Sequence, residues 1–122
     1  MSFQFDPTRP IYLQIMEEIK KRSVRGRYPP GSQVPSVREM AGEMGVNPNT
    51  VARAYMELER EGFTFTRRGQ GSFVVEEEGR IEAERRNLAA AALRRFVSEI
   101  RELELRADQI EELLNELGGA LR

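Results

Sequence analysis

Residues 36–62, SVREMAGEMGVNPNTVARAYMELEREG, decide the fold, because they predict two short helices joined by a tight turn. Ser36 and Glu39 have the spacing of a capping box, in which each side chain accepts a hydrogen bond from the other residue's backbone N–H. Gly45 ends the helix that Ser36 begins, since glycine readily adopts the left-handed conformation that follows many helices. Asn47 is a good N-cap for the next helix, and the proline after it suits the first helical position. This order is typical of a helix-turn-helix.

The apolar residues in and before this stretch recur at helical spacing and predict the buried faces of three helices. The first helix begins at Pro10, where the missing N–H does no harm, and ends near Gly26. The second and third helices end at Gly45 and Gly62. The predicted core contains Ile11, Tyr12, Ile15, Met16, Ile19, Val37, Met40, Ala41, Met44, Val51, Ala54, Tyr55 and Leu58.

Two β-prone segments follow, FTFT at 63–66 and SFVV at 72–75. The residues between them, RRGQG at 67–71, are basic and rich in glycine, as expected at the tip of a hairpin. The phenylalanines of both segments are expected to pack within the sheet. A helix, a helix-turn-helix and a hairpin in this order predict a winged helix over residues 1–75.

The rest of the chain is predicted to be a charged linker at 76–80 and a helical tail at 81–122. The expected fold class is therefore mainly α with a small β-hairpin, a winged helix-turn-helix followed by a short two-helix tail. Two short helices cannot shield both of their apolar faces within one subunit, so we expect the tail to form a homodimer. The predicted dimer residues are Leu93, Phe96, Val97, Ile100, Leu103, Ile110, Leu113, Leu114 and Leu117.

Composition excludes several classes of protein. The 122 residues contain neither Cys nor His, which excludes disulfides, thiolate metal sites and His-based catalysis. The first ten residues, MSFQFDPTRP, lack the pattern of a signal peptide, and the sequence has no apolar run of about 20 residues. We therefore expect a cytoplasmic protein without a signal peptide or a membrane partner. The net charge of −1 hides an asymmetry between the two parts of the chain. Residues 1–75 have three more basic than acidic residues, whereas residues 76–122 have four more acidic than basic residues. The basic half is the one suited to face phosphates.

Several motifs in order closely resemble the GntR family of bacterial repressors: VPSVREMA at 34–41, NPNTV at 47–51, LEREG at 58–62 and RGQGSFV at 68–74. The resemblance covers residues 10–75 and implies a DNA-binding winged helix. The segment NPNTVARAY at 47–55 is similar to the YtrA-type branch of the family, whose short helical tails form dimers. This chain has Pro48 and Ala52 where many members outside that branch have arginine, so the base contacts of those arginines do not carry over.

The predicted DNA contacts lie on the helix-turn-helix and on the hairpin. The third helix offers its N-terminal N–H groups to a phosphate, and opposite its apolar side it carries Asn and Arg side chains suited to base edges. Glycines in the hairpin allow positive φ and close approach to a groove, where arginine is attracted by the negative potential of the minor groove. The contact of Arg38 is implied by the resemblance. The candidate residues are Arg38, Asn47, Asn49, Thr50, Arg53, Arg67, Arg68, Gly69 and Gly71.

Each of these assignments has a purely structural alternative. Arg53 has Glu57 four residues later as a partner for a surface ion pair. Asn49 suits the start of a helix, and the hydroxyl of Thr50 is able to satisfy a local backbone group. The hairpin glycines are also explained by the turn alone.

Together these features predict a sequence-specific DNA-binding transcription regulator, a repressor by the resemblance, that binds a palindromic operator as a homodimer. Its two recognition helices would read half-sites about 34–36 Å apart. The alternatives are an architectural DNA binder that senses no ligand and a winged-helix module that binds proteins. An enzyme is not favoured, because no phosphate loop or metal-ligand spacing accompanies the acidic residues. No cofactor is predicted, and a small-molecule effector at the dimer or interdomain interface stays unassigned.

Overall fold

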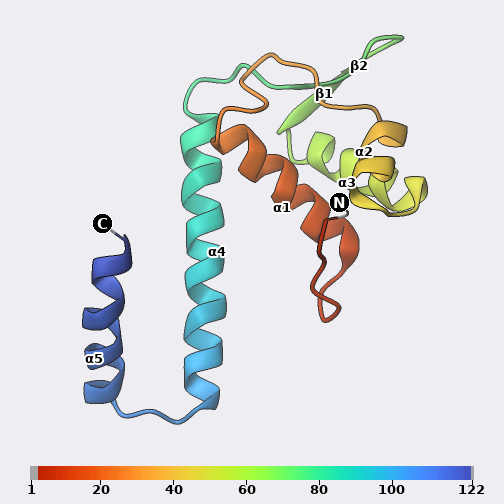
Figure 1. Ribbon diagram of the computed structural model, residues 1–122. Coiled ribbons are helices and arrows are strands. Elements are labelled where there is room, and N and C mark those ends of the chain that lie inside the picture. Colours follow the sequence, from red (N-terminus) through yellow and green to blue (C-terminus); the bar gives the residue numbers. More distant parts are fainter. Residues whose placement is uncertain (1–2, 122) are drawn as a thin grey trace. The chain divides into compact units, whose positions relative to one another are not determined.

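The computed structural model describes residues 3–121, which form two compact units, one reaching to Leu88 and the other beginning at Ala89 (Figure 1). The elements are α1 (Ile11–Val24), α2 (Val37–Met44), α3 (Pro48–Arg60), β1 (Thr64–Arg67), β2 (Gly71–Val74), α4 (Arg80–Glu102), α5 (Ala107–Gly118) and a 3-10 turn (Gly119–Leu121). This mainly helical chain with one two-stranded hairpin confirms the predicted fold class. Within residues 3–121, no helix combines the length and the apolar character of a membrane span.

The first unit has its core between α1, α2, α3 and the hairpin, and α3 packs against both other helices. The largest side chains with no exposed surface include Ile15, Ile19, Met40, Leu58 and Phe63. Ile11, Tyr12 and Val37, which helical spacing assigns to the core, are only partly buried and lie at its edge. The apolar side of α3 is thus fixed inward, and its opposite side is left at the surface.

The predicted starts of α2 and α3 are confirmed, whereas α1 begins at Ile11, one residue after the predicted Pro10, which is its N-cap. Ser36 Oγ accepts a hydrogen bond from the Glu39 N–H at 3.1 Å, and the Ser36 N–H donates to Glu39 Oε1 at 3.0 Å. The hydrogen bond from the Ser36 backbone holds the pKa of Glu39 below its usual value, and the Ser36 side chain adds to this effect. Asn47 Oδ1 accepts from the Asn49 N–H at 2.7 Å and so caps α3. Gly45, between the two helices, has a φ of 70°, which glycine adopts without strain.

The two strands are shifted from the predicted segments by one residue each, so that β1 begins at Thr64 and β2 ends at Val74. The shift at β1 arises because the Phe63 N–H donates to the carbonyl of Leu58, at the end of α3, at 2.9 Å. Phe63 therefore belongs to the helix terminus and the core. The rings of Phe65 and Phe73 stack across the hairpin with centroids 5.7 Å apart, which confirms that they pack within the sheet.

A further segment, residues 31–34, runs along the free edge of β2. The Gly31 N–H donates to the Val74 carbonyl at 2.8 Å, and the Val34 N–H donates to the Ser72 carbonyl at 2.9 Å. The sequence does not reveal this pairing, because a Pro-Pro-Gly turn carries no sign of a pairing partner far along the chain. This pairing anchors the hairpin to the loop that precedes α2.

Helix α4 begins at Arg80, so the predicted linker at 76–80 is one residue too long. The Arg80 guanidinium donates to the carbonyl oxygens of Glu61 and Gly62, at the end of α3, at 3.0 Å each. Its Nε also donates to Glu84 Oε1 at 3.1 Å. These contacts hold the first turn of α4 within the first compact unit. The charged residues around Arg80 predicted a solvated linker. The local sequence does not reveal that the Arg80 guanidinium donates to backbone carbonyls at the end of another helix.

The second unit contains the C-terminal part of α4, a turn and α5, which runs back alongside α4 (Figure 1). In the turn, the Glu104 N–H donates to the Arg101 carbonyl at 3.2 Å. Glu104 has a φ of 52°, a left-handed conformation that favours glycine. Helix α5 ends at Gly118, the first residue of a Gly-Gly pair.

Candidate nucleic-acid interface

An open pocket of about 550 Å³ lies where the first turns of α1 and α3 meet. It is lined by Pro10, Ile11, Tyr12, Asn49, Thr50 and Arg53. Three residues that the sequence predicts to contact DNA are therefore brought to one place. Arg38, on α2, is exposed but lies outside this lining, as do the candidate residues of the hairpin.

The Arg53 side chain projects from α3 and lies over the ring of Tyr12 on α1, with Cζ 3.8 Å from the ring centroid. The ion pair with Glu57 that the sequence offers as an alternative is not formed, because Glu57 pairs with Arg60 at 3.6 Å instead. Among residues 3–121, no hydrogen bond or ion pair occupies the guanidinium nitrogens of Arg53. Its N–H donors therefore remain available to an external acceptor.

The two asparagines at the start of α3 have different roles in the fold. The side-chain oxygen of Asn47 is committed to the helix cap. Asn49 takes part in this cap only through its backbone N–H, and its side chain is exposed. Helix-start chemistry thus accounts for Asn47 but leaves the side-chain amide of Asn49 unused, and an exposed amide is suited to the paired donor and acceptor of an adenine edge.

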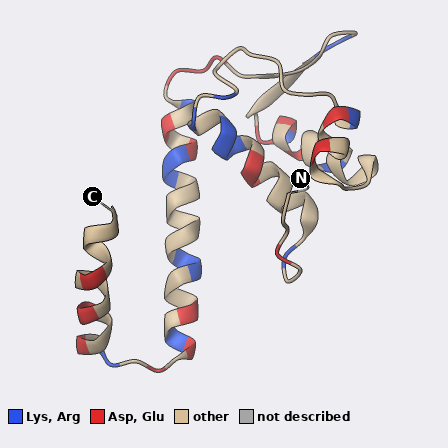
Figure 2. Ribbon diagram, in the orientation of Figure 1, with Lys and Arg blue, Asp and Glu red and all other residues tan. Residues whose placement is uncertain are grey.

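The hairpin tip carries the other predicted contacts, and Figure 2 shows basic residues there. The Arg67 guanidinium lies 5.4 Å and 5.0 Å from the ring centroids of Phe65 and Phe73. Arg68 is exposed beside it. Gly69 has a φ of 78° and open space where a Cβ would stand, so its conformation, not crowding within the protein, calls for glycine.

Sequence reasoning missed Gln33, which supports this tip from the neighbouring segment. Its Nε2 donates to the Gln70 carbonyl at 2.5 Å. A Cβ on Gly71, where φ is 114°, would stand only 2.8 Å from the same Nε2. The glycine at 71 is thus required by its conformation, and a Cβ there would also displace the Gln33 amide, a contact to which nothing in the sequence around Gln33 pointed.

A second missed contact joins the hairpin to α3. The Thr66 N–H donates to Glu59 Oε1 at 2.8 Å. A carboxylate on the exposed side of α3 thus holds the start of the hairpin against that helix. Helical spacing alone assigns Glu59 to a solvated face, because the backbone group it accepts from belongs to the next element.

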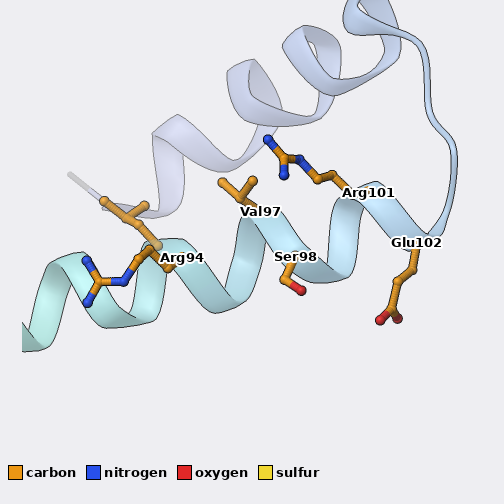
Figure 3. Close-up of a pocket in the computed structure, with 6 residues that line it drawn as sticks. Arg94, Val97, Ser98, Arg101 and Glu102 are labelled. Carbon is orange, nitrogen blue, oxygen red and sulfur yellow. The ribbon is translucent and has the colours of Figure 1, made fainter.

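The tail presents an apolar face to solvent within the single chain. Leu93, Val97 and Leu103 are exposed by 64%, 46% and 66%, and the three leucines of α5, Leu113, Leu114 and Leu117, by 41%, 50% and 50%. Phe96, Ile100 and Ile110 are partly buried. An open hollow of about 640 Å³ follows one side of α4 and is lined by Leu93, Arg94, Val97, Ser98, Arg101 and Glu102. Figure 3 shows Arg94, Val97, Ser98, Arg101 and Glu102 spaced along this helix.

Comparison with protein families gives a match to bacterial regulatory proteins of the gntR family over residues 11–74. The HTH-type transcriptional regulator YhcF of Bacillus subtilis is 44% identical over 112 residues, which are 92% of this chain and 93% of that protein. The HTH-type transcriptional repressor YtrA of the same organism is 48% identical over 75 residues, 60% of this chain and 58% of that protein. The match to YtrA agrees with the branch that the 47–55 segment indicates.

Solved structures give the same result. A GntR family transcriptional regulator from Listeria monocytogenes has a TM-score of 0.77 and 37% identity, covering 92% of this chain and 98% of that one. The DNA-binding domain of AraR, solved in complex with operator ORX1, has a TM-score of 0.56 and 26% identity over 62% of this chain and 95% of that one. The winged-helix unit thus has a relative that was solved bound to an operator.

Proposed function

The chain belongs to the GntR family of bacterial regulatory proteins, and from that premise we propose that it is a cytoplasmic repressor that binds a palindromic operator as a homodimer. Its relatives are transcription regulators, not enzymes. Residues 1–75 bind DNA, and the tail at 81–122 joins two subunits. The proposed contacts to DNA are Arg38, Asn47, Asn49, Thr50, Arg53, Arg67, Arg68, Gly69 and Gly71.

The observation that carries this proposal is the exposed side of α3. Asn49, Thr50 and Arg53 line one open pocket, and the guanidinium of Arg53 has no hydrogen-bonding partner among residues 3–121. Arginine and asparagine are the side chains that pair in bidentate fashion with guanine and adenine in the major groove. Unused donors on a helix of this kind are what a base-reading surface requires.

The dimer rests on the apolar surface of the tail. Six large apolar side chains from Leu93 to Leu117 are more than 40% exposed in the single chain. Burial of apolar surface stabilises association, and a second copy of the same tail would supply the matching face. A dimer also explains how a small unit reaches specific affinity, because two recognition helices double the contacts to DNA. The acidic α5, which has no Lys or Arg, is suited to lie away from the phosphates (Figure 2).

The proposed function is tested by selecting bound duplexes from random DNA with the purified protein. We expect an inverted repeat whose half-sites are separated by about one helical turn or a multiple of it. The affinity for the selected duplex should fall linearly on a double-logarithmic plot against salt, with a slope of about −0.9 per phosphate contacted. Recovery of no common sequence despite salt-sensitive binding would indicate an architectural binder, and no DNA binding at all would indicate a protein-interaction module.

The Arg53→Ala variant is expected to lose about 1–3 kcal/mol of discrimination at one base pair of each half-site, while the fold is retained, because Arg53 is exposed. Binding to the selected duplex and to its single-base variants, measured by fluorescence anisotropy, checks this. The matched control is Arg60→Ala, which removes the same charge from an arginine whose side chain is 82% exposed at the other end of α3. If both variants weaken binding equally on every duplex, Arg53 reads no base.

A further inference from the structure

Tyr12 lies in the first turn of α1, where helical spacing predicts a core residue. It is instead partly buried at the edge of the core, and its ring lies 3.8 Å from Cζ of Arg53. Both residues line the pocket beside Asn49 and Thr50. The ring therefore has one side on the protein core and carries the arginine at the predicted DNA-binding surface.

We propose that Tyr12 is a positioning residue that presents the Arg53 guanidinium for base reading, an inference that rests on the proposed function. The face of an aromatic ring carries partial negative charge and attracts a cation within about 6 Å of its centroid. A guanidinium is planar, and its N–H donors point outward in its own plane. A ring that covers one face of the guanidinium thus restrains its orientation without using any of the donors that a base edge requires.

Arg53 differs from most of the other cations that lie over aromatic rings, because it has no carboxylate partner in the described part of the chain. Lys20, Arg27 and Arg80 each have a carboxylate partner as well, at 3.1, 3.7 and 3.1 Å. Within residues 3–121, Arg53 and Arg67 are the two ring-stacked cations without an ion-pair or hydrogen-bonding partner. These two arginines stand on the recognition helix and on the hairpin tip, the elements expected to meet DNA. In the rest of the winged-helix unit, ring-stacked cations are used to hold the fold together.

This arrangement affects both affinity and selectivity. A long arginine side chain loses rotamer freedom when it binds, and a side chain already restrained on a ring loses less. A guanidinium held in one orientation also approaches a base pair from one direction. Two of its N–H donors can then pair with the two acceptors of a guanine edge, which the other bases do not offer in the same arrangement. Tyr12 is therefore expected to sharpen the selectivity of Arg53 without touching a base.

The test uses a fluorescein-labelled duplex recovered by selection and the same duplex changed at the base pair whose preference Arg53→Ala abolishes. Tyr12→Leu, which keeps apolar volume but removes the ring, should weaken binding to the selected duplex about 3- to 10-fold and flatten the preference at that base pair. Tyr12→Phe keeps the ring and should bind within about 2-fold of wild type. A phenylalanine variant as poor as the leucine variant would assign the effect to the hydroxyl and overturn the proposal.

A double-variant cycle separates positioning from a structural role. In the Arg53→Ala background, Tyr12→Leu should have no further effect on affinity or base preference, because its target is gone. Equal losses in both backgrounds would mean that Tyr12 acts on the fold, and the proposal would be wrong. Arg53→Lys offers a check that leaves the core untouched: it keeps the charge but lacks the planar fork, so it should lose the base preference. Wild-type selectivity in the lysine variant would also overturn the proposal.

Failure of the underlying function gives a different result. If the wild-type protein recovers no common sequence from random DNA, the proposed function itself falls, and the role of Tyr12 falls with it. If Arg53→Ala loses a base preference but Tyr12→Leu does not, the function stands and only the role of Tyr12 is overturned.

Discussion

The Leu93→Glu/Val97→Glu variant is expected to sediment as a monomer at micromolar concentration and to bind the two-half-site operator about 10²-fold more weakly than wild type. Both side chains are largely exposed on one chain, at 64% and 46%, and line the hollow along α4. If a second tail covers them, two carboxylates there would be desolvated without a matching set of partners. A monomer then loses the second half-site, whose binding is effectively intramolecular in the dimer.

The matched control is Asn87→Glu/Asn115→Glu. It adds the same two charges at exposed positions of α4 and α5, and helical spacing places both on the sides opposite the apolar residues. This variant should remain dimeric and retain its affinity. A dimeric Leu93→Glu/Val97→Glu variant would place the interface elsewhere, and a monomeric variant with unchanged affinity would show that one subunit suffices for binding.

The Arg22→Met variant is expected to lower the free energy of unfolding by about 3–5 kcal/mol. Arg22 is 6% exposed on α1, and its Nε donates to Glu18 Oε2 at 2.9 Å. Its Nη1 lies 2.9 Å from Tyr28 Oη and 2.7 Å from Glu43 Oε1, so one side chain joins α1 to α2 and to the loop between them. Methionine keeps much of the apolar stem but removes the donor to the buried Tyr28 hydroxyl and the nearest cation of Glu18, which keeps only the exposed Arg25 at 3.3 Å.

The charge of Arg22 is secure in the native fold. Burial lowers its pKa, but the hydrogen bonds with Tyr28 and Glu18 outweigh that effect, and the net result is a pKa above the ordinary value of arginine. The expected loss lies toward the lower end of the range for a buried ion pair, because the Glu43 side chain is 35% exposed and keeps Arg27 at 3.7 Å.

Urea denaturation followed by circular dichroism, at one fixed protein concentration, measures this change. Arg25→Met is the matched control, since its side chain is 62% exposed and meets the same Glu18 at 3.3 Å. It should cost less than about 1 kcal/mol, as exposed ion pairs usually do. Equal losses for the two variants would mean that burial does not strengthen the role of Arg22.

The caps of α2 and α3 were predictable, because the bonds of Ser36 with Glu39 and of Asn47 with Asn49 join residues two or three positions apart. The buried stripes were predictable as well, since helical periodicity states which face must be apolar. Helical periodicity could not predict which residues lie at the edge of the core, as the partly exposed Tyr12 does. It also had no way to anticipate Arg22, since a charged side chain is expected at the surface unless its partners are known.

The candidate contact residues were likewise named from local patterns, and the structure leaves Asn49, Arg53 and Arg68 exposed as that interpretation requires. The residues that hold these contact residues in place could not be predicted from the sequence. The Tyr12 ring beneath Arg53 and the Gln33 amide on the hairpin tip come from other elements. Such pairs form only when helices and strands pack, and their members are ordinary residues in their own surroundings.

The amino-acid sequence by itself determined the order of elements, the ends of the two short helices and the side of α3 that faces inward, because each of these depends on residues within a turn or two of one another. Only the tertiary structure decided which cations hold the fold together and which keep their donors unused. That division depends on distances between α1, α3, the hairpin and the first turn of α4, which are set by how a common core is filled.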